Sequence, residues 1–264
     1  MDWYKIKSIL IALFLLINIL LLGLIFYNSV KDSRTDRMEI ESAVKVMKLN
    51  NINISPDQVD SKPSKAYSIT ILNPMTDAGA FAEKMLGGTP SLQGKEYLFE
   101  SKKLKINGIN FIYENTLYKE AGTPSRKLVK SAKKELVNMG FDMKYSKSQI
   151  KNNTIIFTQR VHGNELFGSK LSVTACDKGI ITVTGSWAEV SRVSSSDVVI
   201  TSAAEVLIAF LRDENRPADT SDIISVKYGA GLTLDASDYR TAETVPLWKI
   251  TLKNGKEFFY DARK

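Results

Sequence analysis

The residues best suited to acid–base or nucleophilic chemistry are few in this chain. His162 is the single histidine and stands close to Glu165, so the pair could serve as a base and its orienting carboxylate. Ser194, Ser195 and Ser196 could supply a nucleophilic hydroxyl. A catalytic triad needs a scaffold that brings such groups together, yet these serines lie in a polar stretch, expected to be a loop, without the G-x-S-x-G turn. We therefore expect no catalytic residue.

Metal and redox chemistry is limited by the counts of one histidine and one cysteine. They exclude a His-pair zinc site, a C-x-x-C redox centre and an intramolecular disulfide. Cys176 lies beside a predicted hairpin turn, where we interpret it as a small, half-buried side chain. Residues 87–89 (GGT) and 229–231 (GAG) lack the Lys-Ser/Thr ending of a phosphate-binding loop and are predicted to be turns. We expect no metal, no cofactor and no cofactor-binding residue.

Charge and composition narrow the class of protein further. The 264 residues are 44% hydrophobic and carry a net charge of +7, with the basic residues spread along the chain. Such a modest, dispersed charge gives no support for nucleic-acid binding. The composition also excludes low-complexity, collagen-like and disulfide-scaffold proteins.

The longest apolar stretch covers residues 8–30, 23 positions without a charge. About 20 helical residues cross a hydrocarbon core of roughly 30 Å, so residues 1–30 are predicted to be a cytoplasmic tail and one transmembrane helix. No small-x-small cleavage site follows, which indicates an uncleaved signal anchor. The short tail favours a cytoplasmic N-terminus and an extracytoplasmic C-terminal domain.

Three residues within this span, Ala12, Asn18 and Gly23, are candidates for contact with a partner helix in the membrane. Small residues such as Ala12 and Gly23 allow another helix to approach, and an asparagine in hydrocarbon favours a hydrogen-bond partner. The alternative is a single-pass anchor that simply tolerates one asparagine. The sequence leaves both interpretations open.

The remainder of the chain predicts an α+β fold of antiparallel sheets with packed helices. Residues 31–54 form a juxtamembrane amphipathic helix with an apolar stripe at Ile40, Ala43, Val44 and Met47, which could continue the membrane helix as a stalk. Residues 55–120 form a first α+β subdomain and residues 121–264 a second. Expected strands are 67–72, 96–100, 103–106, 109–114, 154–161, 170–175, 180–186, 223–228, 247–252 and 256–261.

Further helices are expected at 77–86, from Thr123-Pro124, and from the capping box at 202–205, whose apolar face is assigned to Ala204, Leu207, Ile208 and Leu211. Asn107-Gly108 predicts a two-residue hairpin turn. Trp187 and Trp248 are interpreted as core residues. Helix starts near Thr123 and Thr201 lie 78 residues apart and hairpin glycines Gly179 and Gly255 lie 76 apart, which indicates two related α+β units beside a smaller N-terminal part.

Several stretches resemble one known family. They are residues 1–9 (MDWYKIKSI) before the apolar run, 49–55 (LNNINIS), 157–161 (FTQRV) leading into 163–167, and 245–250 (VPLWKI) with Gly255 and 259–261 (FYD). With the length and architecture, they resemble the YycI family of membrane-anchored regulators. The ending also resembles PepSY-type modules.

The resemblance implies an accessory protein that associates with a YycH-like sister protein and a sensor histidine kinase of the WalK (YycG) type. It implies modulation of the kinase's control over cell-wall metabolism, contact through the membrane helix, and no catalytic centre. The leading hypothesis is thus a non-enzymatic, membrane-anchored regulator. The alternatives are a PepSY-like envelope module that binds or inhibits a wall hydrolase or protease, and an anchored hydrolase, which would need a polar cleft with convergent acidic or Ser/His groups.

Overall fold

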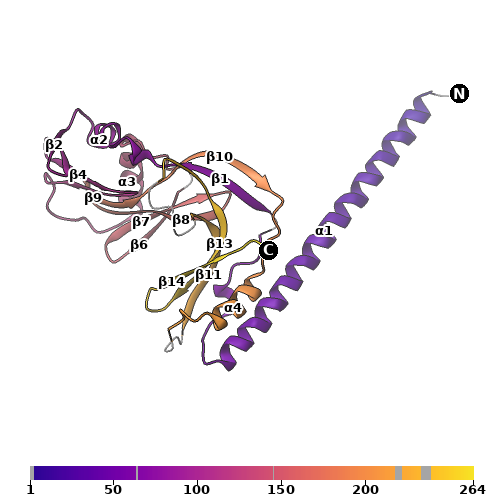
Figure 1. Ribbon diagram of the computed structural model, residues 1–264. Helices are drawn as coiled ribbons and strands as arrows, with labels where there is room; N and C mark the ends of the chain where they lie inside the picture. The colour runs from indigo at the N-terminus through magenta and orange to yellow at the C-terminus, as the bar shows by residue number, and fades with distance from the viewer. Residues whose placement is uncertain (1–2, 64, 145, 218–221, 233–238) are drawn as a thin grey trace. The chain divides into compact units, whose positions relative to one another are not determined.

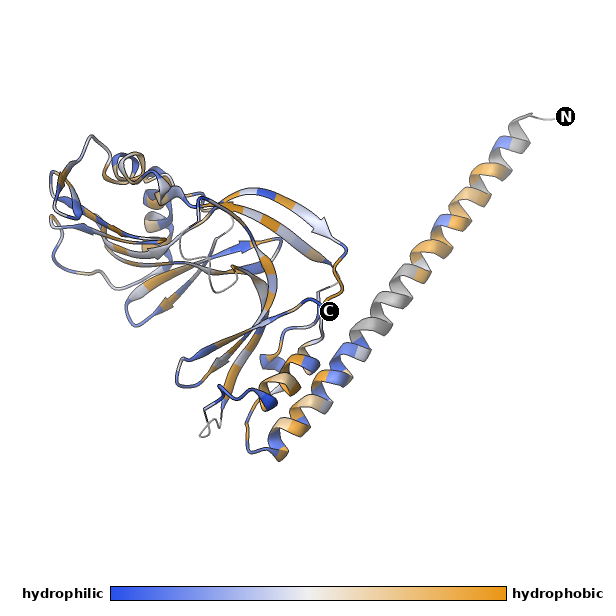
Figure 2. Cartoon of the chain, viewed as in Figure 1, coloured by the Kyte–Doolittle hydropathy of each residue, from blue (hydrophilic) through white to orange (hydrophobic). Residues whose placement is uncertain are grey.

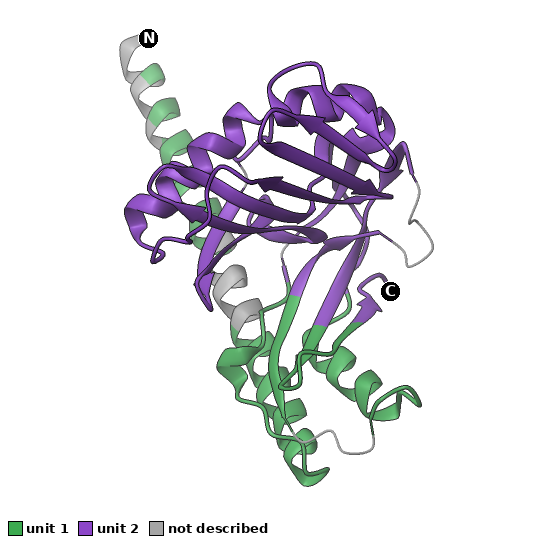
Figure 3. Cartoon of the chain, turned by 90° about the vertical axis from the view of Figure 1, so that its left-hand side faces the viewer, with its two compact units in different colours: residues 1–62, 201–227, 250–258 green, residues 63–200, 228–249, 259–264 purple. Residues whose placement is uncertain are grey.

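The protein is described by a computed structural model that covers residues 3–63, 65–144, 146–217, 222–232 and 239–264 (Figure 1). Contacts divide the chain into two compact units, each assembled from segments far apart in the sequence. Unit 1 comprises Met1–Lys62, Thr201–Lys227 and Ile250–Phe258, and unit 2 comprises Pro63–Ile200, Tyr228–Lys249 and Phe259–Lys264 (Figure 3). The division at residues 31, 55 and 121 expected from the sequence stays a prediction.

Unit 1 is built around the C-terminal turns of helix α1 (Trp3–Leu49) and helix α4 (Ala203–Arg212), which pack together. The predicted stripe of Ile40, Ala43, Val44 and Met47 is buried, with Met47 fully inaccessible. After a 3-10 turn, η1 (Pro56–Gln58), the chain is held by the hydrogen bond from Asp60 N to Val226 O at 2.8 Å. The prediction of an amphipathic helix at this end of α1 is confirmed.

Helix α4 begins with the predicted capping box, in which Ser202 and Glu205 bond to each other's backbone N–H groups. Its buried face, however, consists of Ala203, Val206, Leu207 and Phe210. The expected face was wrong except for Leu207. The helix is apolar on several sides, and the large Phe210 ring decides its rotation by packing edge-on against Phe258 at 5.3 Å.

The N-terminal part of α1 includes the predicted membrane segment. Its described residues from Leu10 to Leu24 are mostly hydrophobic and exposed (Figure 2). Among the residues that the structure describes, no helix is long and apolar enough to cross a membrane. The membrane segment therefore stays a prediction from the sequence, and part of it, residues 8, 9, 12 and 25–30, lies outside the described side chains.

The described strands form two sheets, and β11 (Ile223–Gly231), β13 (Val245–Leu252) and β14 (Glu257–Asp261) contribute residues to both units. The small sheet has the order β10–β1–β12, with β1 at Ala66–Leu72, β10 at Glu189–Ser196 and β12 at Thr241–Glu243. The large one has the order β14–β13–β11–β8–β9–β5–β4–β3–β2, and β6 joins it through β7, which pairs with β8. Its other strands are β2 (Ser91–Gln93), β3 (Glu96–Phe99), β4 (Lys102–Asn107), β5 (Asn110–Asn115), β6 (Ser146–Lys151), β7 (Thr154–Val161), β8 (Asn164–Cys176) and β9 (Gly179–Ser186).

Antiparallel pairing was predicted, and it holds for most pairs, but β11 pairs with β8 in parallel. Two helices, α2 (Ala78–Leu86) and α3 (Arg126–Asn138), contact the large sheet at β3 and β4 and at β8 and β9, respectively. Between helices and sheet lies the main apolar core, which includes Phe81, Phe111, Leu136, Phe157 and Leu171. The mixed α+β class is thus confirmed.

Several local predictions shift by one or two residues. The hairpin between β4 and β5 turns at Gly108-Ile109, because Asn107 pairs with Asn110 and only the glycine takes a positive φ, +58°. Glycine at the first central position suits a II′ turn. Helix α3 begins after Ser125, whose Oγ accepts the Leu128 N–H at 3.2 Å, and not at Thr123-Pro124. Trp187 and Trp248 are buried, as predicted.

Candidate functional site

The residues expected from the sequence to be the best candidates for catalysis do not form a triad. His162 is exposed in the turn between β7 and β8, where its ring stacks on Tyr67 at 4.5 Å. Ser194, Ser195 and Ser196 lie in strand β10, opposite β1, and not in the expected loop. Among the described residues, His162 makes no hydrogen bond to Glu165 or to these serines.

Glu165 has a structural environment of its own. Its Oε1 accepts a hydrogen bond from Lys249 Nζ at 2.8 Å, and both side chains are largely buried. The same ammonium lies over the ring of Phe167, 4.6 Å from its centroid. This ion pair links β8 to β13 within unit 2. Removing one partner would leave the other charge buried and unpaired, which is strongly destabilising.

The remaining sequence candidates are structural. Cys176 is half-buried at the end of β8, as expected. Gly87 ends α2 with a φ of +79°, in agreement with the predicted turn. Gly229 and Gly231 instead belong to strand β11, so that prediction was wrong. A Cβ on Gly229 would lie 2.4 Å from Glu165 O, so glycine is needed for the close approach of β11 to β8 and not for a turn. Within the described parts, no three His, Cys, Asp or Glu side chains gather as metal ligands.

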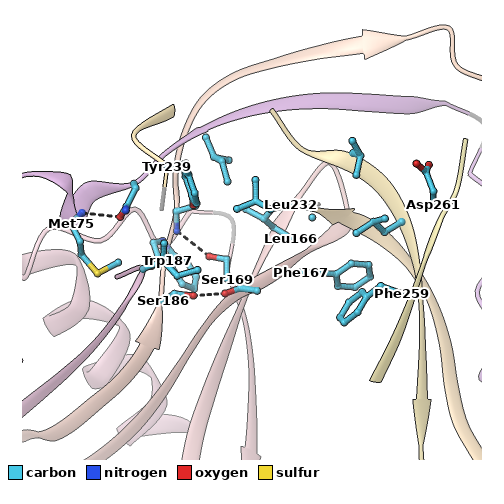
Figure 4. Close-up of a pocket in the computed structure, with 18 residues that line it drawn as sticks. Met75, Leu166, Phe167, Ser169, Ser186, Trp187, Leu232, Tyr239, Phe259 and Asp261 are labelled. Carbon is cyan, nitrogen blue, oxygen red and sulfur yellow. Dashed lines mark hydrogen bonds between the residues drawn. The ribbon is translucent and has the colours of Figure 1, made fainter. Parts of the chain in front are cut away.

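A cavity of about 540 Å³ lies entirely within unit 2 (Figure 4). Its size falls within the range of roughly 300–1,000 Å³ common for small-molecule sites. Its walls are mainly apolar and aromatic, with a few polar groups between them. The lining residues are Ile71, Asn73, Met75, Ile109, Leu166, Phe167, Gly168, Ser169, Ser186, Trp187, Ala188, Gly231, Leu232, Tyr239, Val245, Leu247, Phe259 and Asp261.

The cavity originates from an irregularity in strand β8. Thr158 of β7 pairs with Lys170, but Arg160, two residues on, pairs with Glu165, five residues back. The four residues 166–169 therefore lie opposite the single residue Gln159, so β8 has three more residues than β7 here, and all four line the cavity. Gly168 has a φ of +84°, a backbone conformation that glycine adopts without strain.

Strand β8 also changes its partner on the opposite edge at this point. Leu166 pairs with Ala230 of β11, whereas Lys170 pairs with Ser186 of β9. Beyond these pairs, β11 and β9 leave β8, and the residues that follow them, such as Trp187 and Leu232, form cavity walls. The split between two partner strands leaves the space that the cavity occupies.

A buried hydrogen-bond network holds the extra residues of β8 in place. Gln159, buried in β7, accepts from Ser169 Oγ at 2.5 Å and donates from Nε2 to Ala188 O at 2.9 Å. Ser169 Oγ in turn accepts the Ala188 N–H at 3.1 Å, and Ser186 Oγ donates to Gly168 O. Because satisfied buried networks are rigid, we infer that the cavity is preformed.

The polar groups of the cavity wall differ in how far the protein satisfies them. Trp187 Nε1 donates to Asp142 O at 3.2 Å, so its indole N–H is satisfied. Asn73 is 8% exposed, and its Oδ1 accepts the Met75 N–H at 3.0 Å. The exposed Asp261 carboxylate is bound by the Arg263 guanidinium, which holds the pKa of that carboxyl below its usual value. In Figure 4, Phe167 and Phe259 lie near this charged end and Met75 and Trp187 lie at the other.

Sequence reasoning did not identify this site. Two signals were available: Gln159 is a polar residue on the otherwise apolar buried face of β7, and Gly168-Ser169 interrupts a long strand pattern. Neither signal reveals that strands from three parts of the chain meet there. Residues 157–167, which carry part of the family resemblance, include Gln159 and two wall residues, Leu166 and Phe167.

The three predicted membrane-helix contact residues lie in α1. Asn18 is half-buried and donates from Nδ2 to Phe14 O, one turn back, at 2.7 Å. Gly23 is exposed, and a Cβ placed on it would meet no atom within 4 Å. Ala12 lies outside the described side chains. Contact with another helix at these residues stays a prediction.

Comparison with known structures gives a fold relationship. The crystal structure of YycH from Bacillus subtilis is similar with a TM-score of 0.51 and 14% sequence identity, over 75% of this chain and 52% of that one. The chain thus spans about half the length of that YycH chain. An uncharacterized protein from Eubacterium rectale ATCC 33656 gives a TM-score of 0.45 and 12% identity, over 76% of this chain and 84% of that one.

The similarity to YycH is one of fold, at an identity too low to indicate more. A search of curated proteins finds no match. Comparison with protein families finds the family described as YycI protein, which matches residues 28–263. This match extends over both compact units and includes every described residue of the cavity wall. Since it covers far more than half of the 264 residues, the chain belongs to the YycI family.

Proposed function

We propose that this protein is a membrane-anchored, non-enzymatic accessory protein that regulates a sensor histidine kinase of the YycG (WalK) type. The observation that carries the proposal is the family match over residues 28–263. The kinase would control cell-wall metabolism, and a YycH-like sister protein would take part in the same complex. The fold similarity to YycH is consistent with two related accessory proteins.

The proposed location is the cell membrane, with a single span, a cytoplasmic N-terminus and the C-terminal domain outside the cytoplasm. Support comes from the sequence, in which residues 8–30 carry no charge. Residues 31–49 continue the same helix, α1, into the packed part of unit 1. Because α1 is one continuous helix, a change in contacts at one end could be transmitted to the other end.

Contact with the kinase would involve Ala12, Asn18 and Gly23. The side-chain hydrogen bond of Asn18 to Phe14 O uses one amide hydrogen, and its carbonyl oxygen and second hydrogen can serve a neighbouring helix. The open space beside Gly23 suits the close approach of another backbone.

Co-purification of the full chain with the kinase and the sister protein from detergent-solubilised membranes tests this proposal. Asn18→Leu combined with Gly23→Leu should reduce the kinase recovered several-fold, because it removes the polar group and the space for a partner helix. Ile17→Leu combined with Leu22→Ile is the matched control, since it keeps the apolar character of neighbouring positions. Unchanged recovery in the first variant would argue against the membrane contact, and no recovery by the unaltered chain would argue against the whole complex.

A further inference from the structure

We propose that the cavity of unit 2 binds one small, uncharged molecule with an apolar body and a carbonyl or hydroxyl oxygen. This binding site goes beyond the regulatory role proposed above and does not depend on it. It follows from the shape of the cavity, its apolar walls, one available hydrogen-bond donor and the charge of its wall residues.

The apolar body is indicated by the walls. Leu166, Leu232 and Leu247 contribute aliphatic surface, and Phe167, Trp187 and Phe259 contribute aromatic surface, from several different elements. Side chains that face an open space lack dispersion partners on that side. A ligand of matching shape would supply those contacts, and the hydrogen-bonded bulge of β8 keeps the space open without it.

The oxygen atom is indicated by Asn73. This wall residue is more than nine-tenths buried, and its Oδ1 is occupied by the Met75 N–H. In the described part of the chain, no protein acceptor binds its Nδ2. The Nδ2 donor is therefore available at the wall, and a ligand oxygen placed against it would gain a hydrogen bond.

The absence of net charge on the ligand is indicated by Asp261. It is the one charged side chain among the described wall residues, and Arg263 already neutralises it. The nearby Lys249 ammonium is held by Glu165 and contacts the Phe167 ring. An anionic ligand would therefore lose its hydration without meeting a free cation at the wall.

Photolabelling of the full chain in detergent micelles tests this inference with a matched pair of probes. Benzophenone is neutral and has two rings and one carbonyl oxygen, whereas 4-benzoylbenzoate adds only a carboxylate. After irradiation, labelled residues are mapped by mass spectrometry. We expect benzophenone to label the wall residues, Met75 among them, at least about tenfold more than the carboxylate probe.

Two variants alter the site in opposite ways. Asn73→Asp keeps the acceptor for Met75 N but replaces the amide donor with an anion, so benzophenone labelling should fall about tenfold. Leu232→Lys places a cation at the wall, and labelling by the carboxylate probe should rise until the two probes label comparably. Ile224→Lys, an exposed position of unit 1 outside the wall, should leave both probes unchanged.

Circular dichroism verifies that each variant is folded, and Leu232→Lys carries the test alone if Asn73→Asp does not fold. Equal labelling of the wall by both probes in the unaltered chain, or no labelling of it by benzophenone, would overturn the inference. So would a folded Leu232→Lys protein whose preference for the neutral probe is unchanged.

Discussion

Unit 2 contains two apolar regions that share strand β8 and differ in how completely they are filled. The first, which we call the closed core, surrounds Leu171, Val173 and Ala175 of β8 and is covered by α2 and α3. The second is the cavity region around residues 166–169. There β1 contributes Ile69 and Ile71, and β10 contributes Val190. Leu171 and Leu166 are the same residue type, five positions apart, and are 0% and 2% exposed.

The difference between the regions arises from strand pairing and not from hydrophobicity. Along 170–173, β8 is paired continuously with β7 on one edge and β9 on the other, so its inward side chains meet a regular surface. Along 166–169 the pairing with β7 is interrupted and β9 gives way to β11. A buried side chain of β8 therefore belongs to a filled core where β8 is paired regularly with its neighbouring strands. It belongs to a cavity wall where that pairing is interrupted.

The largest expected effect is the loss of a side chain from the closed core. Leu171→Ala should lower the free energy of unfolding by about 3–5 kcal/mol, because every removed methyl group leaves an unfilled space between β8 and the helices. Urea unfolding of the full chain, followed by tryptophan fluorescence, measures it. A loss near 1 kcal/mol would show that this region relaxes around the space and is not closed.

An effect of intermediate size is expected from the tyrosine of the closed core. Burial, aided by the negative charge of Glu135, raises the pKa of Tyr113 to about 12. The unfolded phenol ionises near pH 10, so the unfolded chain binds fewer protons than the folded chain between pH 10 and about 12. The free energy of unfolding should therefore fall by about 2–3 kcal/mol as the pH rises through this interval.

Tyr113→Phe separates this contribution from the rest of the alkaline response. Phenylalanine cannot ionise, so the variant should lose that part of the decline while keeping the ring packed in the closed core. Unfolding midpoints measured from pH 8 to pH 12 make the comparison. Identical pH dependence of the two proteins would mean that Tyr113 is hydrated and that the core is more open than the structure indicates.

The sequence predicted elements that depend on local signals better than elements that depend on pairing between distant strands. Elements governed by local signals were predicted well: strand β7 at 154–161, the capping box at Ser202 and the C-cap at Gly87. Strand β10 was missed, because its serine-rich pattern lacks apolar alternation and its pairing with β1 is distant in sequence. Gly229 was misread as part of a turn, since a close approach of two strands leaves the same glycine signal as a turn.

The candidate site could not be predicted for a related reason. The cavity depends on a register shift between β7 and β8 and on the change in the partner of β8 from β9 to β11. The change of partner involves contacts between residues far apart in the sequence. A single sequence records only their local traces, Gln159 and Gly168. The exclusion of Cys/His metal sites, in contrast, required only counting, and residue counts do not depend on tertiary structure.

The smallest expected effect is the counterpart of the first. Leu166→Ala should lower the free energy of unfolding by about 2 kcal/mol, the low end of the usual range for a buried leucine, because Leu166 borders the cavity and the space left by its methyl groups joins a space that already exists. The same urea experiment measures it beside Leu171→Ala, on the same strand and with the same atoms removed. A larger cavity should still admit benzophenone, so photolabelling of Met75 should persist in this variant. If instead the two leucines cost the same, the cavity wall would be as tightly packed as the core, and pairing register would not be what separates the two regions.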